Sequence, residues 1–95
     1  MLDVRQTRVY VSWFSKLRDR RARARIDVRI RRLSLGVPGD VKAIAEGVSE
    51  LRVDYGPGYR IYFIHRGESV ILLAGGDKDS QDRDIKRALL LARNL

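Results

Sequence analysis

The sequence predicts one α+β domain in the order β-α-α-β-β-β-α, with an antiparallel sheet packed against an N-terminal helical hairpin and a C-terminal helix. The first observation concerns residues 50–64. Apolar and polar side chains alternate there on both sides of a Gly56-Pro57-Gly58 turn, as in two paired strands. The second observation is that stretches before and after them repeat apolar residues at helical spacing. The 95 residues are enough for a single hydrophobic core, so we expect one domain over residues 1–95.

The N-terminus predicts a short edge strand followed by a helix. Residues 2–6 are mixed in character and end at Thr7, which is a suitable N-cap for a helix over about residues 8–17. Apolar side chains recur in this helix at positions i, i+3, i+4 and i+7. They are Tyr10, Trp13, Phe14 and Leu17. We interpret this stripe as part of the core rather than as a platform for stacking bases.

A second helix, the most basic element, begins after a break near Arg18-Asp19 and runs to about Leu35, where Gly36 fits the position after its end. One narrow arc of this helix is basic and the neighbouring arc is apolar, which indicates the buried side. The basic arc holds Arg18, Arg21, Arg25, Arg29 and Arg32, and the apolar arc holds Ala22, Ile26, Ile30 and Leu33. Because charges of one sign repel each other, we expect an anion beside this stripe, with nucleic-acid backbone as the first candidate. The alternative is a solvated helix whose arginine stems shield the edge of the core.

The hairpin around Gly56-Pro57-Gly58 is expected to pair Tyr55 with Tyr59 across a three-residue loop. This register puts the apolar side chains of both strands on one face, and a slip of one residue would expose them all. On the opposite face it places Asp54 opposite Arg60, and Arg52 opposite Tyr62. We expect function on this polar face.

The remaining segments predict one strand and one helix. Before the hairpin we expect a loop with only a short extended piece at residues 41–44. Residues 69–74 are almost continuously apolar, which is typical of a central strand buried on both faces. Asp79 or Ser80 caps a final helix over about residues 81–94. Ile85, Leu89 and Ala92 lie on one face of this helix, with Ala88 and Leu91 beside it.

Composition excludes several classes of site and indicates the kind of partner. The formal net charge of +8 implies a polyanion or an acidic protein as partner. The absence of cysteine and the single histidine exclude disulfides, thiol nucleophiles and the common zinc sites, and we expect no metal or other cofactor. The chain contains no apolar run of membrane-spanning length and no apolar signal segment, so we expect a cytoplasmic protein. His65, near a turn, is expected to be structural or solvated.

Two motifs placed within this element order resemble the RelE/ParE superfamily of type II toxins. They are LRVDYGPGYRIYF at residues 51–63 and GGDKDSQDRDIKRA at residues 75–88. Within the superfamily the chain is most similar to the small HigB-like branch of addiction module killer proteins, over essentially its whole length. The resemblance implies a toxin held in a hetero-oligomer by its cognate antitoxin. RelE-type relatives cleave mRNA on the ribosome without a metal, whereas ParE-type relatives inhibit DNA gyrase.

The resemblance also implies catalytic roles for four residues. Arg60 matches the strand arginine of the family and would contact the scissile phosphate, bidentately where geometry allows. Arg52 and Lys78 match basic positions and would stabilise the charge that develops in the transition state, and Lys78 would also serve as the acid. Glu50 is the candidate base, with a salt bridge to Arg52 or Lys78 as the alternative interpretation.

Candidate substrate-binding residues complete the expected site. Tyr62 shares the polar face and would stack on a base, and Tyr59 is a further candidate. Gln81 either hydrogen-bonds RNA or caps the last helix. The basic stripe would contribute Arg25, Arg29 and Arg32. Several nuclease relatives use a C-terminal tyrosine or histidine that residues 75–95 lack, so a ParE-like gyrase inhibitor and a catalytically inactive basic RNA-binding module stay open as alternatives.

Overall fold

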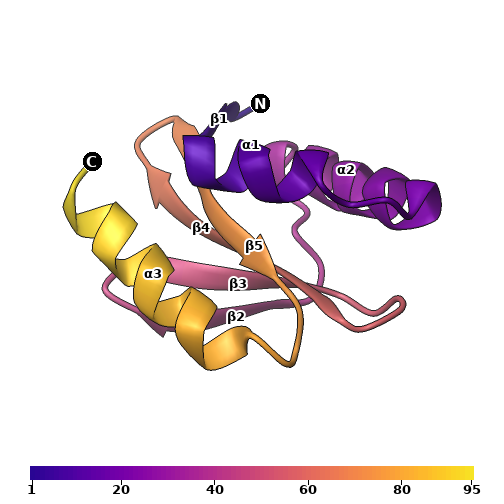
Figure 1. Ribbon diagram of the computed structural model, residues 1–95. Helices are drawn as coiled ribbons and strands as arrows, with labels where there is room; N and C mark the ends of the chain where they lie inside the picture. Colours follow the sequence, from indigo (N-terminus) through magenta and orange to yellow (C-terminus); the bar gives the residue numbers. More distant parts are fainter.

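A five-stranded sheet lies between two layers of helices in the computed structural model, which describes residues 1–95 (Figure 1). The strands follow the order β1-β5-β4-β3-β2, with β1 parallel to β5 and all other neighbours antiparallel. The elements are β1 (Asp3–Gln6), α1 (Arg8–Ser15), α2 (Arg20–Ser34), β2 (Val41–Ala45), β3 (Val48–Val53), β4 (Tyr59–Arg66), β5 (Ser69–Gly76) and α3 (Gln81–Arg93). The α+β class is confirmed, but the expected element order is one strand short.

The additional strand is β2, which pairs with β3 through a two-residue turn at Glu46 and Gly47. Both turn residues have positive φ angles, 53° and 83°, which is the backbone that a tight hairpin of type I′ needs. A glutamate rarely adopts this conformation, so the turn has no local sequence signal, and the expected loop with a short extended piece at residues 41–44 is corrected to a full strand. The Glu46 side chain forms two hydrogen bonds with Arg93 of α3, at 3.0 and 2.7 Å, and this contact helps to hold the turn against the helix.

Side-chain caps begin the first two helices, the predicted one at Thr7 and a second one at Asp19 that was not predicted. The Thr7 hydroxyl accepts a hydrogen bond from the Tyr10 backbone N–H at 3.1 Å and donates one to the Leu73 carbonyl at 2.6 Å. The same residue therefore starts α1 and attaches it to β5. Asp19 caps α2 by accepting from the first-turn N–H groups, and Gly36 follows the helix with a φ of +84°.

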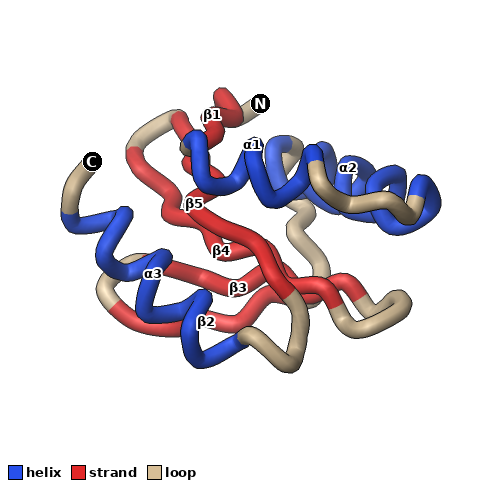
Figure 2. Tube along the Cα trace, in the orientation of Figure 1, coloured by secondary structure: helices blue, strands red, loops and turns tan.

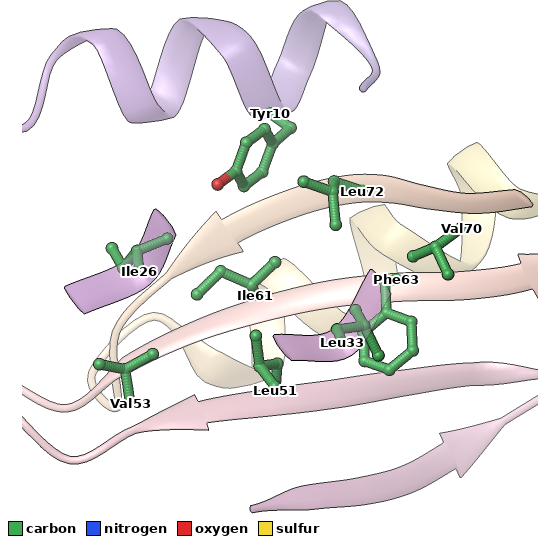
Figure 3. Packing of buried hydrophobic residues seen from close by; sticks show 9 residues of the cluster. All are labelled: Tyr10, Ile26, Leu33, Leu51, Val53, Ile61, Phe63, Val70 and Leu72. Carbon is green, nitrogen blue, oxygen red and sulfur yellow. The ribbon is translucent and has the colours of Figure 1, made fainter. Parts of the chain in front are cut away.

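The sheet separates α1 and α2 from α3 (Figures 1 and 2) and divides the core into two clusters. Helices α1 and α2 cover one face, where the nine side chains of Figure 3 pack together. They are Tyr10, Ile26, Leu33, Leu51, Val53, Ile61, Phe63, Val70 and Leu72. Helix α3 covers the other face with Ala88 and Ala92 against Tyr62 and Leu73. Strand β5 contributes to both clusters, which confirms the expected central strand.

The β3–β4 hairpin has the expected faces but not the expected register. Val53 pairs with Tyr59 and Arg52 pairs with Arg60, two residues away from the predicted pairing. The loop between the strands is five residues long rather than three. Because side chains alternate with a period of two, a shift of two residues leaves every side chain on its predicted face. The apolar rows therefore meet as expected, but Asp54 lies outside the strand and does not oppose Arg60.

Two consecutive glycines end β5 because helices pack closely on both of its faces there. The Trp13 indole of α1 occupies the space that a Cβ at Gly75 would need. The Asp84 carboxylate of α3 occupies the corresponding space at Gly76 on the other face. These glycines belong to the strand rather than to the loop that leaves it, and their lack of side chains lets α1 and α3 approach the end of the sheet.

Candidate functional site

The centre of the candidate site is a fully buried carboxylate, that of Glu50 in β3, under the first turn of α3. Its Oε1 accepts a hydrogen bond from the Gln81 side-chain amide at 2.5 Å, and its Oε2 accepts one from Arg52 Nε at 3.2 Å. Arg60 Nε lies 3.8 Å from Oε1. One carboxylate therefore holds two arginines and the start of α3 together, and a buried charge of this kind needs such partners.

The strand pairing explains why these groups meet. Glu50 pairs with Tyr62, and Arg52 with Arg60, so that all four side chains project from the face that α3 covers. Gln81 is the first residue of α3, and its side chain reaches the Glu50 carboxylate from the helix layer that covers this face. Its side chain bonds to Glu50 and does not cap the helix, so the cap interpretation is wrong, and its expected contact with RNA stays a prediction.

The β5–α3 loop is held in place by a network that sequence reasoning did not identify. Asp77 Oδ1 accepts hydrogen bonds from the backbone N–H groups of Asp79 at 2.9 Å and Ser80 at 3.2 Å. The Ser80 hydroxyl then donates to Asp84 Oδ2 at 2.5 Å. The spacing of Asp77 and Ser80 was a usable signal, because aspartate side chains commonly bond to backbone N–H groups two residues further on. The network fixes the loop that carries Lys78.

Arg60 combines near-complete burial with unused donors. Only 10% of its side chain is exposed, and its Nη1 donates to the Tyr59 carbonyl at 3.3 Å. Its buried Nε has no hydrogen-bond partner. Arg52 is more open, with 34% of its side chain exposed, and lies 4.0 Å from Asp40 as well as beside Glu50. An anion arriving at this end of the sheet would therefore meet Arg52 first and Arg60 beneath it.

Lys78 lies at the same end of the sheet as Arg60. The carbon atoms of its side chain pack over Gly58 at the end of the β3–β4 loop. Gly76, two residues before it, pairs directly with Arg60. Lys78 is exposed and forms no ion pair. The fold thus brings Arg52, Arg60 and Lys78 to one end of the sheet, with Arg52 and Arg60 beside the buried Glu50 carboxylate and Lys78 packed over Gly58.

Tyr62 does not occupy the position that base stacking requires. Its ring is fully buried beneath α3, and it lies opposite Glu50 rather than opposite Arg52. Its hydroxyl has no hydrogen-bond partner. Burial, together with the negative charges of Glu50 and Asp84, raises the pKa of the Tyr62 phenol well above its ordinary value. The expected stacking role is therefore wrong for this conformation of the protein.

Tyr62 and Tyr10 predict that the protein loses stability in alkali. Burial raises the pKa of both phenols above the ordinary value near 10. Between the ordinary and the raised pKa the unfolded chain releases protons that the folded chain retains. Below about pH 9 these two tyrosines should therefore not change the free energy of unfolding. Above that pH the free energy of unfolding should fall with rising pH, by up to about 1.4 kcal/mol per pH unit for each tyrosine.

Chemical denaturation between pH 8 and pH 11 measures this effect. Tyr62→Phe should reduce the slope of the free energy of unfolding above pH 10 relative to the wild-type protein, because one of the phenols with a raised pKa is absent. Removing a hydroxyl that has no partner should not itself destabilise the protein. Equal slopes for the two proteins would show that Tyr62 does not contribute.

The other expected binding residues lie on the opposite face of the sheet. Tyr59 is half-buried on the side covered by α1. Its ring packs edge-on against Trp13, with 6.2 Å between the ring centroids. Arg25, Arg29 and Arg32 belong to α2, which covers that same side. Arg29 is largely committed to structure, since it donates to the carbonyl oxygens of Arg52, Pro38 and Asp40. The structure therefore does not join these residues to Arg60 in one site.

Two further expectations can be compared with the geometry. His65 is exposed at the far end of β4, as expected for a solvated residue. No group of three or more histidine, cysteine, aspartate or glutamate side chains is arranged to hold a metal ion. The chemistry that the arrangement supports is stabilisation of an oxyanion by Arg52, Arg60 and Lys78, with Glu50 orienting the two arginines.

Comparison with known proteins gives two matches. Residues 12–95 match the family described as "Phage derived protein Gp49-like (DUF891)". An "Uncharacterized protein" of Haemophilus influenzae (strain ATCC 51907 / DSM 11121 / KW20 / Rd) is 50% identical over 95 residues, which cover 99% of this chain and 96% of that protein. No solved structure matches the sequence significantly. None of the three helices has the length and apolar character needed to cross a membrane.

Proposed function

Because the chain belongs to the Gp49-like family, which is associated with toxin–antitoxin modules and related to RelE-type toxins, we propose that it is the toxin of such a module and a member of the HigB-like branch. We further propose that it arrests translation by cleaving mRNA on the ribosome, without a metal. The observation that supports cleavage is that Arg52 and Arg60 flank the buried Glu50 carboxylate and that Lys78 lies at the same end of the sheet.

The reaction requires attack of a ribose 2′ oxygen, whose proton passes to solvent water, on the adjacent phosphorus and departure of the 5′ oxygen. The phosphorane that forms carries more negative charge than the ground-state phosphodiester. Arg60 and Arg52 supply positioned N–H donors for this charge, and donors of this kind contribute on the order of a few kcal/mol each. Lys78, which is exposed and unpaired, protonates the leaving 5′ oxygen.

Glu50 has a positioning role in this proposal and is not the base. A general base must reach the proton that it removes. The Glu50 carboxylate is fully buried, and Gln81, Arg52 and Arg60 surround it. The salt-bridge interpretation of Glu50 therefore describes its contacts better. Fixing two long, flexible arginines in one geometry reduces the entropy lost when a phosphate binds between them.

Two classes of macromolecule are proposed as partners. The net charge of +8 suits the anionic ribosome and its mRNA, and it also suits an acidic surface on the cognate antitoxin. Such an antitoxin would form a hetero-oligomer with the toxin, which we propose to be a cytoplasmic protein. Binding of this protein to each of these partners should weaken with rising salt, since exposed charges are screened.

Expression of the protein in bacteria tests the proposed activity. Messenger RNA 5′ ends should be mapped after induction, in parallel with measurements of DNA supercoiling. We expect new 5′ ends in phase with codons in translated messages, and none in the same messages when their start codons are removed. Intact messages accompanied by altered supercoiling and an SOS response would refute the nuclease and support gyrase inhibition. Intact messages with unaltered supercoiling would leave a basic RNA-binding module.

A further inference from the structure

A cavity of about 430 Å³ lies between α1 and α3 at the end of β5. Figure 1 shows these two helices on either side of the strand. Each helix lines the cavity with residues at positions i, i+1 and i+4, which fall within one arc of about 100°. They are Ser12, Trp13 and the C-cap residue Lys16 of α1, and Arg83, Asp84 and Arg87 of α3. The side of a helix that faces the rest of a domain is normally apolar, so these two polar arcs indicate a site for a polar ligand.

The end of β5 forms another wall of this cavity, through residues 74–77. Strand β1 pairs with β5 only as far as Leu72, so residues 74–76 have a strand neighbour on the β4 side alone. In an antiparallel pair, successive residues alternately turn their N–H and C=O groups toward the partner and away from it. At least one of residues 74–76 therefore turns both groups away from β4, and outside the sheet no hydrogen bond to these residues is formed. A ligand in the cavity can bond to these backbone groups.

Two carboxylates of the lining each keep one oxygen without a hydrogen bond. The Asp84 side chain is only 9% exposed; Ser80 donates to its Oδ2, and its Oδ1 lies 3.7 Å from Arg83 Nε. Asp77 Oδ1 accepts from two backbone N–H groups of the β5–α3 loop, but Asp77 Oδ2 accepts from none. An ionised carboxylate can only accept hydrogen bonds. The free oxygens therefore select a ligand that presents N–H or O–H donors.

Two cations of the lining are not committed to a carboxylate. Lys16 and Arg87 are exposed, and neither forms an ion pair. Arginine and lysine are the side chains that bind phosphate groups most strongly. Because the cavity combines free cations with free acceptors, it suits a ligand that carries both an anionic group and N–H donors.

Trp13 adds an aromatic surface to this lining. Its six-membered ring packs on Gly75, and its side chain is partly exposed. Nucleic-acid bases bind favourably to aromatic side chains, and a nucleotide joins such a flat ring to a phosphate. We propose that the cavity binds a single nucleotide, with its base against Trp13, its N–H donors on Asp77 and Asp84, and its phosphate at Lys16 and Arg87.

Guanine is the base that the free carboxylate oxygens favour. Its Watson–Crick edge carries two neighbouring donors, N1–H and N2–H, whereas uracil carries a single one. The nucleotide can be free or part of an RNA chain, because Gly76 in the cavity wall pairs with Arg60 and the cavity therefore lies one strand away from the proposed cleavage site. The inference goes beyond that proposal, since nucleotide binding requires neither Arg60 nor the ribosome.

Trp13 is the only tryptophan of the chain, so its fluorescence reports directly on this cavity. GMP, UMP and guanosine are titrated into the full-length protein at low salt, with free tryptophan as the control for light that the nucleotides absorb. We expect saturable quenching by GMP, and affinities at least about tenfold lower for UMP, which has fewer donors, and for guanosine, which lacks the phosphate. Equal affinity of GMP with either of the other two would overturn the inference, because a contact that defines it would be absent.

Two pairs of matched variants locate the bound nucleotide. Ser12→Phe fills the cavity and should weaken GMP binding at least about tenfold, whereas Ser15→Phe, on the same helix but outside the lining, should change it less than about twofold. Arg87→Glu should weaken GMP binding to a similar extent and leave guanosine binding unchanged, whereas Lys86→Glu should have little effect on either. All four positions are exposed, so circular dichroism should show native helix content. GMP binding that neither Ser12→Phe nor Arg87→Glu alters would place the nucleotide elsewhere and overturn the inference.

A short 2′-O-methyl RNA that contains one guanine separates the two sources of the nucleotide. A response to GMP assigns the cavity to free nucleotides, and a response to the RNA alone, with the same variant pattern, assigns it to a nucleotide of an RNA chain. If neither ligand alters Trp13 fluorescence or produces heat in calorimetry, the inference is overturned. The cleavage proposal would survive that result, because Arg52, Arg60 and Lys78 do not line the cavity and mRNA cleavage is measured separately.

Discussion

Replacing Arg60 by alanine is expected to lower the rate of ribosome-dependent mRNA cleavage about 10²- to 10³-fold, the loss typical of removing one positioned donor from an oxyanion site. Arg60 pairs with Arg52 in the sheet and lies beside Glu50, and its guanidinium is held in place by Glu50 and by the Tyr59 carbonyl. The measurement is a reconstituted translation reaction in which cleavage of a defined message is followed by primer extension. Growth arrest on induction should disappear in parallel.

Two further variants control for loss of folding and for loss of charge. Arg93→Ala removes an arginine that is also ion-paired, but at the exposed contact with Glu46, and it should leave cleavage unchanged. Arg60→Lys keeps the positive charge but removes the planar fork, so we expect partial activity at most. Full cleavage by a folded Arg60→Ala protein would remove Arg60 from the chemistry and, with it, the proposed site.

Replacing Glu50 by alanine should reduce the free energy of unfolding by about 3 kcal/mol, the lower end of the range for breaking a buried ion pair. The substitution leaves the nearly buried Arg60 without its counter-charge and the Gln81 amide without its acceptor. Arg52 should contribute less, since it is about one-third exposed and water screens its charge. For a domain of this size, the melting temperature should fall by more than about 10 °C.

Glu46 provides a close control for Glu50. Both glutamates lie beside an arginine on another element, but Glu46 is exposed where Glu50 is buried. Glu46→Ala should therefore shift the melting temperature only slightly, because exposed ion pairs contribute little. The two variants are compared by thermal unfolding at one pH and one salt concentration. Similar small shifts for both would show that the Glu50 cluster does not stabilise the fold.

Periodicity predicted the faces of the sheet but not its register. The alternation in β3 and β4 identified which side chains meet the core, and that assignment held although the pairing differs by two residues. Register depends on the conformation of the five-residue loop, which a Gly-Pro-Gly signal alone does not specify. Strand β2 was missed for a related reason, because the turn at Glu46 requires a conformation that its sequence does not favour.

The candidate site was only partly predictable. Arg60, Arg52, Lys78 and Glu50 were identified as candidates, and the fold places them at one end of the sheet. The burial of Tyr62 was not predictable, because alternation shows that a side chain lies on the polar face without showing that α3 covers it. The Gln81–Glu50 contact joins residues 31 positions apart and had no local signal.

The sequence by itself determined the elements whose signals are local: the capped helices, the apolar rows, the central strand and the basic character of α2. Only the tertiary structure determined which of those elements pack against one another. In the tertiary structure α3 covers Glu50, so that this candidate base is buried and binds Arg52 and Arg60 instead. The tertiary structure also put the α2 arginines on the opposite face from Arg60. The physical reason is that burial and proximity depend on which elements stack on each face of the sheet, and periodicity within one element carries no information about its neighbours.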